Sequence, residues 1–137
     1  MVRIRRKGVA LVDTSKGILV VAGRRKIFAL PGGGADKGES RKHAAMRELR
    51  EETGLFTKKR TYLFSYYGGK WHTRKGSVKN HAKVFLIRAY GHARPRHEIK
   101  HIAYWKPGCK LRISSGTEKL IKKYLETKRK SLKRFFS

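Results

Sequence analysis

The sequence has 137 residues, of which 36 are lysine or arginine and only 9 are aspartate or glutamate, so the formal net charge is +27. A hydrophobic fraction of 39% argues against a disordered chain, and no apolar run reaches the roughly 18 residues of a membrane span. The length predicts one domain over residues 1–137, and the excess of cations predicts an anionic partner such as a nucleotide or a nucleic acid.

The first residues and the cysteine content favour the cytoplasm. The segment MVRIRRKGVALVD has a basic head, but Asp13 interrupts its apolar run, so we expect a first strand and not a secretory signal. Cys109 is the only cysteine, which excludes a disulfide within the chain and is typical of a reducing compartment. We therefore expect a cytoplasmic protein with no membrane partner.

The N-terminal part reads as strands followed by a loop. The apolar runs GVALVD and GILVVAG are separated by TSK, which predicts a β-hairpin over residues 8–23. KIFAL then leads into PGGGADKGE, whose glycines and proline predict a loop.

A helix is expected after this loop. Ser40 is a favourable N-cap and Gly54 a favourable stop, so the helix should span residues 40–53. The residues expected on its buried side are Ala45, Met46, Leu49 and Thr53.

The rest of the chain predicts more strands and a final helix. TYLFSYY, AKVFLIRAY and IAYW are strand-like, and a capping box from Ser115 to Glu118 opens a basic helix and tail at about residues 115–137. The apolar face of this helix consists of Leu120, Ile121, Tyr124 and Leu125. This order of elements predicts an α/β or α+β sandwich around a mixed sheet.

Acidic residues gather in one place. Five of the nine acids lie between residues 36 and 52, and Glu48, Glu51 and Glu52 share one helical face, where like charges repel. Salt bridges, such as one from Arg47 to Glu51, are one explanation. The other is a divalent cation: carboxylate and carbonyl oxygens suit Mg²⁺ or Mn²⁺, which bridge phosphates and lower the pKa of bound water.

The spacing of these residues matches a known motif. From Gly33 to Leu55 the chain reads G-x5-E-x7-R-E-L-x-E-E-x-G-L, which resembles the Nudix box at every defining position. The flanking segments LPGGG and HEIKHIAYW also resemble the family. The resemblance implies an α/β/α sandwich with a mixed sheet, in which the box over residues 33–55 forms a loop, a helix and a second loop.

The resemblance also implies roles for individual side chains. The metal ligands that it implies are Glu48, Glu51, Glu52 and the carbonyl of Gly32. Arg47 would orient a box carboxylate, and Glu39 would brace the loop or bind an outer metal ion. Glu98 would add a ligand or act as the general base, a role for which Glu51 and Glu48 are the other candidates. Mg²⁺ is the expected cofactor, with Mn²⁺ as the alternative.

Substrate contacts are expected just before the box. Arg24 and Arg25 are placed to meet phosphates, unless they form an ordinary basic edge of the hairpin. Phe28 is a candidate for stacking on a base, although aromatic residues at such spacing more often belong to the core. The same alternatives apply to Tyr66, Tyr67, Trp71 and Trp105.

The resemblance implies hydrolysis of a nucleoside diphosphate linked to a second group, X. The proline that marks ADP-ribose-cleaving members is absent, since Lys70 and Trp71 occupy its region. Markers of members that cleave dinucleoside polyphosphates, NADH or coenzyme A are not apparent. We therefore expect a nucleoside triphosphate, ordinary or oxidised, to be cleaved to a nucleoside monophosphate and pyrophosphate.

The positive charge supports an alternative partner, RNA. The runs RIRRK, GRRK, KKR, KWHTRK and KRKSLKR could follow an RNA backbone, with Trp71 and His72 as stacking groups. The protein would then be either an enzyme acting on the 5′ phosphates of RNA or a non-catalytic nucleic-acid-binding module. The intact box argues against the module, because without a metal ion three clustered glutamates bring only repulsion.

Overall fold

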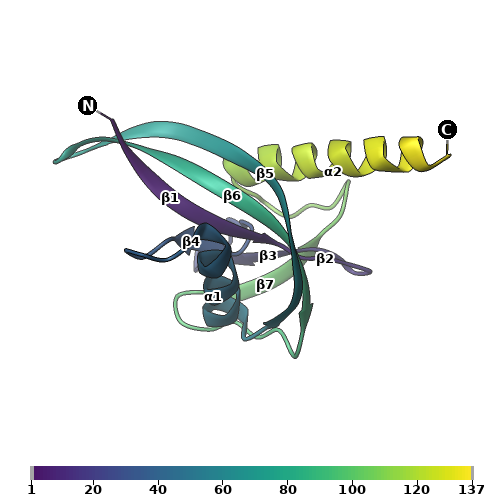
Figure 1. Ribbon diagram of the computed structural model, residues 1–137. Helices are drawn as coiled ribbons and strands as arrows, with labels where there is room; N and C mark the ends of the chain where they lie inside the picture. The colour runs from purple at the N-terminus through teal and green to yellow at the C-terminus, as the bar shows by residue number, and fades with distance from the viewer. Residues whose placement is uncertain (1, 137) are drawn as a thin grey trace.

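The computed structural model describes residues 2–136 (Figure 1). The described elements are β1 (Val2–Leu11), β2 (Asp13–Thr14), β3 (Gly17–Ala22), β4 (Gly32–Gly34), α1 (Arg41–Thr53), β5 (Phe56–Thr73), β6 (Gly76–Tyr90), β7 (His101–Trp105) and α2 (Ser115–Phe136). None of the described helices is both long and apolar enough to cross a membrane.

The strands form two sheets. The larger sheet has the order β4-β1-β6-β5, in which β1 and β6 are parallel and the other pairs are antiparallel. The smaller sheet, β2-β3-β7, is entirely antiparallel. A mixed sheet between helices confirms the expected α/β fold.

The hairpin expected over residues 8–23 is wrong except at its turn. β1 pairs with β4 and β6, whereas β3 pairs with β7 in the other sheet. Only the two-residue β2 pairs with the start of β3. The continuous apolar runs arise because residues 8–11 and all of β3 are buried, as in central strands, and not because the two strands pair with each other.

The expected loop over PGGGADKGE contains a short strand. β4 pairs with β1, so that Gly33 lies opposite Gly8 and Gly32 opposite Val9. A Cβ atom on Gly32 would lie 2.5 Å from the Gly8 carbonyl oxygen. Glycine is therefore needed here for close approach of two backbones, and not only for a turn.

Helix α1 forms as its local signals predict. The Ser40 hydroxyl accepts the His43 amide at 3.0 Å, and Gly54 adopts a left-handed conformation with φ 79° while its amide donates to the Arg50 carbonyl. The expected buried residues Ala45, Leu49 and Thr53 are buried, and Met46 packs beside them.

Helix α2 and its N-cap both lie one residue earlier in the chain than the predicted capping box places them. The hydroxyl of Ser114, not of Ser115, accepts the Thr117 amide at 3.3 Å, so the capping box predicted from Ser115 is wrong. The helix continues to Phe136, and in Figure 1 its C-terminal end projects past the sheets. Of the expected apolar face, Leu120, Ile121 and Tyr124 are buried and Leu125 is partly buried.

Two apolar clusters hold the helices against the strands. One joins Leu49 of α1 to Phe85 and Ile87 of β6, while the other joins Ile121 of α2 to Val84 of β6. Alternate residues of β6 thus face opposite helices, which is the pleat of a strand that lies between two layers. The α/β/α sandwich is therefore confirmed.

Candidate functional site

Helix α1 lies very close to the backbone of the larger sheet. A Cβ atom on Gly8 of β1 would collide with the Arg41 carbonyl oxygen and the Ala45 amide. This close packing brings the acidic face of α1 beside β4, where the glycine-rich strand meets the helix.

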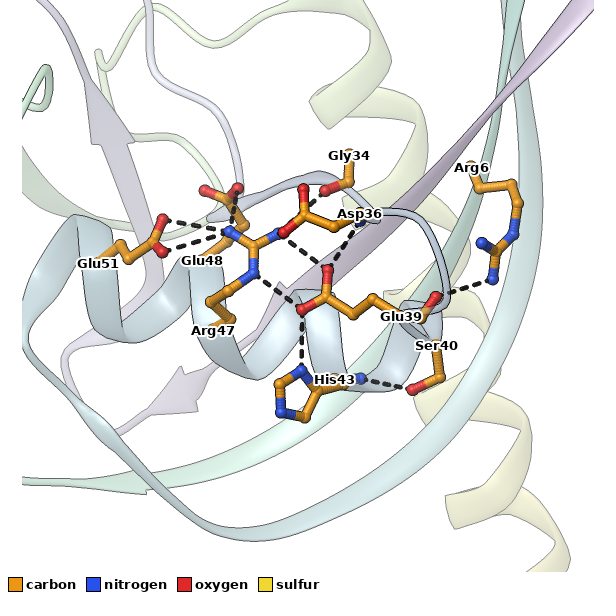
Figure 2. Close-up of polar contacts among 9 residues, drawn as sticks. All are labelled: Arg6, Gly34, Asp36, Glu39, Ser40, His43, Arg47, Glu48 and Glu51. Carbon is orange, nitrogen blue, oxygen red and sulfur yellow. Dashed lines mark hydrogen bonds and ion pairs between the residues drawn. The ribbon is translucent and has the colours of Figure 1, made fainter.

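Arg47 lies at the centre of the acidic cluster (Figure 2). Its guanidinium donates to Glu39 at 2.8 and 3.0 Å and to the Gly34 carbonyl at 3.0 Å. The same group donates to Glu48 at 3.1 Å and to Glu51 at 3.2 Å. The salt bridge expected between Arg47 and Glu51 is therefore present, and one cation neutralises part of the repulsion among three carboxylates.

Glu39 is fully engaged by hydrogen bonds. Besides Arg47, it accepts the Asp36 amide at 3.0 Å and the His43 ring nitrogen at 2.8 Å. These bonds, above all those from Arg47, hold the pKa of Glu39 well below its usual range. This arrangement favours the bracing role over binding of an outer metal ion, because both carboxylate oxygens are already used.

Glu48 lies against the glycine-rich strand. A Cβ atom on Gly33 would be 2.5 Å from its Oε1 atom, so any larger residue here would displace this carboxylate. Burial raises the pKa of Glu48, and the charges of Glu51 and Glu98 add to this effect, whereas Arg47 opposes it.

Glu52 is the most buried carboxylate of the cluster. Its residue is 7% exposed, and its Oε1 accepts the Gly32 amide at 2.9 Å. Burial raises its pKa to about 7, with contributions from Glu48 and Glu98. Without a cation, Glu52 is therefore protonated more readily at neutral pH than an ordinary glutamate.

Glu98 reaches the cluster from a distant part of the sequence. It lies in a turn before β7, and this segment is tied to the end of α1 because the Arg96 and Arg94 amides donate to the Glu52 and Thr53 carbonyls. The charge of Glu98 contributes to the raised pKa values of Glu48 and Glu52. The fold thus brings the charge of Glu98 close enough to influence Glu48 and Glu52 of the box.

Not all expected ligands converge. Among residues 2–136, no three acidic, histidine or cysteine side chains are grouped as a ready-made metal site. Glu51 is half-exposed and turned to Arg47, and Gly32 uses its amide on Glu52. The acids therefore lie near one another, but Arg47 and backbone groups hold several of their oxygens.

The expected substrate contacts have mixed outcomes. Arg24 and Arg25 are exposed in a turn after β3, where they are accessible to an anion. Phe28 is 7% exposed and packs in the α2-side cluster, with its amide bound to the Arg112 carbonyl. Its ring is therefore part of the core, and the predicted stacking on a base is wrong.

A cavity of about 390 Å³ lies between the larger sheet and the start of α2. Its lining includes Lys7 of β1, Tyr66 of β5, Asn80 of β6 and residues 114–117. The Asn80 Oδ1 atom is buried and has no hydrogen-bond partner within the described part of the chain. Burial, with Arg5, lowers the pKa of Lys7, while the nearby Glu52 and Glu48 oppose this shift.

Lys7 and Asn80 are site residues that the sequence did not single out. For Lys7 a signal exists, since alternation along β1 places it on the same face as the buried Val9 and Leu11. For Asn80 the sequence offers none, because its surroundings depend on how β5, β6 and α2 come together.

Comparison with known proteins identifies the family of this site. The model of the NUDIX domain matches residues 3–109. An ADP-ribose pyrophosphatase of Bacillus subtilis is 37% identical over 82 residues, which cover 57% of this chain and 42% of that protein. An ADP-ribose pyrophosphatase of Methanocaldococcus jannaschii is 30% identical over 102 residues, which cover 74% and 59%. The chain thus spans less than two thirds of either relative.

Solved structures agree over more of the chain. The crystal structure of a protein from Chromobacterium violaceum, assigned to the nudix hydrolase family, has a TM-score of 0.75 and 31% identity, covering 97% of this chain and 88% of that one. The NUDIX domain of Shewanella oneidensis NrtR, in complex with ADP ribose, has a TM-score of 0.66 and 16% identity, covering 93% and 88%, and shows the fold alone. With its family model, its intact box and its fold in agreement, this chain belongs to the NUDIX domain family.

Proposed function

We propose that the chain hydrolyses the diphosphate linkage of a nucleoside diphosphate derivative, with ADP-ribose as the first candidate substrate. The observation that carries this proposal is the pair Glu48 and Glu52, whose pKa values are raised by burial and by the nearby charge of Glu98, beside the cavity that Lys7 lines. Buried acids near one another in a protein of net charge +27 favour a function that uses their charge.

The donor chemistry fits a divalent cation. Glu48, Glu51 and Glu52 would hold it with the Gly32 carbonyl, and Glu98 would complete the set. Carboxylate and carbonyl oxygens are the ligands that Mg²⁺ and Mn²⁺ prefer, and two of these carboxyl groups have raised pKa values that a cation would lower. When bound, such a cation neutralises diphosphate oxygens and lowers the pKa of water.

The surrounding side chains would position the reactants. Arg47 would hold Glu48 and Glu51 in place, and Glu39 would hold Arg47. Glu98 is the favoured general base, because it is exposed and has no hydrogen bond or ion pair with other described residues, whereas Arg47 engages the alternatives Glu48 and Glu51. A water deprotonated there would attack one phosphorus atom, and the bridging P–O bond would break.

The cavity is the proposed seat of the nucleoside. Lys7 links it to the acids and would meet the diphosphate, and Arg24 and Arg25 are further candidates for phosphate contact. Tyr66 lines the cavity, and the unpartnered Asn80 oxygen would accept a hydrogen bond from an amino group such as that of adenine.

Two findings differ on the group X. The missing proline favours a nucleoside triphosphate, whereas the two pyrophosphatase relatives carry the name of ADP-ribose. We place ADP-ribose first because these relatives match the chain at 30% identity or more, and a nucleoside triphosphate second. We also propose the cytoplasm as the compartment, because Cys109 is the only cysteine of the sequence.

A substrate panel tests the proposal. The parent chain, Glu52→Gln and the matched control Glu126→Gln would be incubated with Mg²⁺ or Mn²⁺, and products separated by chromatography. The panel holds ADP-ribose, ordinary and oxidised nucleoside triphosphates, a dinucleoside polyphosphate and 5′-triphosphorylated RNA. Glu126 is an exposed acid of α2 and far from the box in sequence.

The expected result is cleavage of ADP-ribose to AMP and ribose 5-phosphate by the parent and the control. Glu52→Gln should reduce this rate by more than about 100-fold, because a ligand matters at least as much as its supporting residues. Full activity of a folded Glu52→Gln variant, or no cleavage of any panel member by the parent, would contradict the proposal. If the parent cleaves only nucleoside triphosphates, these replace ADP-ribose as the proposed substrate.

A further inference from the structure

The face of the larger sheet opposite the cavity carries aromatic and basic side chains in alternation. Strand alternation places Lys79, His81 and Lys83 of β6 on the side of α1, whereas Asn80 faces the cavity. Arg41, the first residue of α1, contacts His81 and confirms which side this is. In Figure 1 the ends of β1, β5 and β6 extend beyond α1.

Two tyrosines of β5 stand on this face. Tyr67 lies opposite His81 in the strand register, and their rings stack with centroids 4.2 Å apart and planes 14° apart. Tyr62 packs edge-on against Phe85, with its hydroxyl 2.7 Å from that of Ser65. Tyr67 remains 56% exposed and Tyr62 51% exposed, so neither is a core residue.

Cations lie beside both rings. The Lys79 ammonium is 5.2 Å from the Tyr67 ring centroid, and the Lys83 ammonium is 5.8 Å from that of Tyr62. Burial lowers the pKa of His81, and Arg41 and Lys83 add to this effect, so its ring is a neutral stacking group at pH 7. Residues 56–90 contain no aspartate or glutamate, so the hairpin offers no acid to neutralise these cations.

We propose that this face, centred on Tyr62, Tyr67 and His81 and flanked by Lys79 and Lys83, binds single-stranded nucleic acid. Exposed rings on a sheet can stack on unpaired bases of any sequence, and interleaved cations can contact the phosphates between them. A double helix would present only phosphates to this face, because its bases are already stacked. The site lies on the other side of the sheet from the cavity and does not depend on the proposed hydrolysis.

Fluorescence anisotropy with a labelled 15-nucleotide oligouridine tests the inference, with Tyr67→Ala as the main variant. Tyr90→Ala is the matched control, since Tyr90 is 55% exposed and also stacks, on Phe56, but lies at the other end of β6. Tyr67→Ala should weaken binding about tenfold, while Tyr67→Trp and Tyr90→Ala should retain it. Lys79→Gln should reduce the salt dependence of binding by about one counterion.

Further measurements separate the outcomes. Glu52→Gln should bind as tightly as the parent, so failure of hydrolysis and failure of this site are distinguishable. Oligothymidine in place of oligouridine identifies the preferred sugar, and Tyr67-dependent binding of either supports the site. Equal effects of Tyr67→Ala and Tyr90→Ala, equal affinity for a duplex of the same length, or no binding at about 50 mM salt would overturn the proposal.

Discussion

The two ends of helix α1 hold carboxylates in opposite electrostatic states. Near its start, Glu39 accepts hydrogen bonds from Arg47, His43 and the Asp36 amide, and its pKa is lowered. Near its end, Glu52 is buried, accepts the Gly32 amide, and has a pKa raised to about 7. The first arrangement stabilises the fold, while the second costs stability and is typical of a functional site.

This difference explains how a basic protein tolerates an acidic cluster. Arg47 extends along the helix and contacts Glu39, Glu48 and Glu51, so its charge is shared by several acids. It does not reach Glu52, whose carboxylate faces the glycine-rich strand. The carboxylate that Arg47 leaves unneutralised is therefore the one that would benefit most from a cation.

Removing Arg47 should have the largest effect on folding. Arg47→Ala leaves three carboxylates without their shared donor, and we expect the free energy of unfolding to fall by about 2–4 kcal/mol. Urea denaturation measures the change, with Arg50→Ala as the control, because the Arg50 side chain is exposed and lies over the Phe56 ring. Equal losses from both variants would mean that the network does not brace the fold.

The state of Glu52 should make stability depend on pH in the absence of metal ions. Its pKa is raised from 4.5 when unfolded to about 7 when folded, so the folded state binds more protons between these values. The contribution of Glu52 protonation to the free energy of unfolding is therefore fully present below pH 4.5, and it is lost as the pH rises through 7. The lowered pKa of Glu39 acts below this range and does not oppose the loss.

The variant Glu52→Gln isolates this contribution, because it keeps an oxygen for the Gly32 amide but carries no charge. With EDTA present, it should match the parent near pH 4.5 and exceed it by at most about 3 kcal/mol at pH 8. Denaturation curves across this range provide the measurement. A difference that does not change with pH would show that Glu52 is not protonated more readily in the folded state.

The sequence predicts the two ends of α1 unequally well. The helix itself follows from local signals, namely the Ser40 cap, the Gly54 stop and the four-residue repeat from Ala45 to Thr53. The ion pair from Arg47 to Glu51 follows from helical spacing alone. In contrast, the burial of Glu52 depends on β4, and the glycines of this segment predicted a loop and not a strand.

Strand partners were harder to predict, because pairing depends on segments far apart in the sequence. β1 and β3 are neighbours in the chain, but each is a central strand of a different sheet. A continuous apolar run indicates that a strand is central in its sheet, but it does not indicate which strands pair with it. The cavity could not be predicted for the same reason, because Lys7 and Asn80 come to line it through the parallel pairing of β1 and β6.

The smallest expected effect concerns the position of Glu48 at the functional end. A Cβ atom introduced by Gly33→Ala would be 2.5 Å from Glu48 Oε1, and the flexible carboxylate can move away. We therefore expect a change in unfolding free energy below about 1 kcal/mol but a rate of hydrolysis lower by about tenfold, since small displacements at reacting groups are costly.

Gly69→Ala is the control for the stability measurement, because a Cβ atom at Gly69 meets nothing within 4 Å. Gly69 lines the proposed nucleoside cavity, so the rate of Gly33→Ala is compared with that of the parent. A rate for Gly33→Ala equal to that of the parent would mean that the place of Glu48 beside β4 does not matter for the reaction. A lower rate at unchanged stability would instead tie activity to the end of α1 that Arg47 leaves unneutralised.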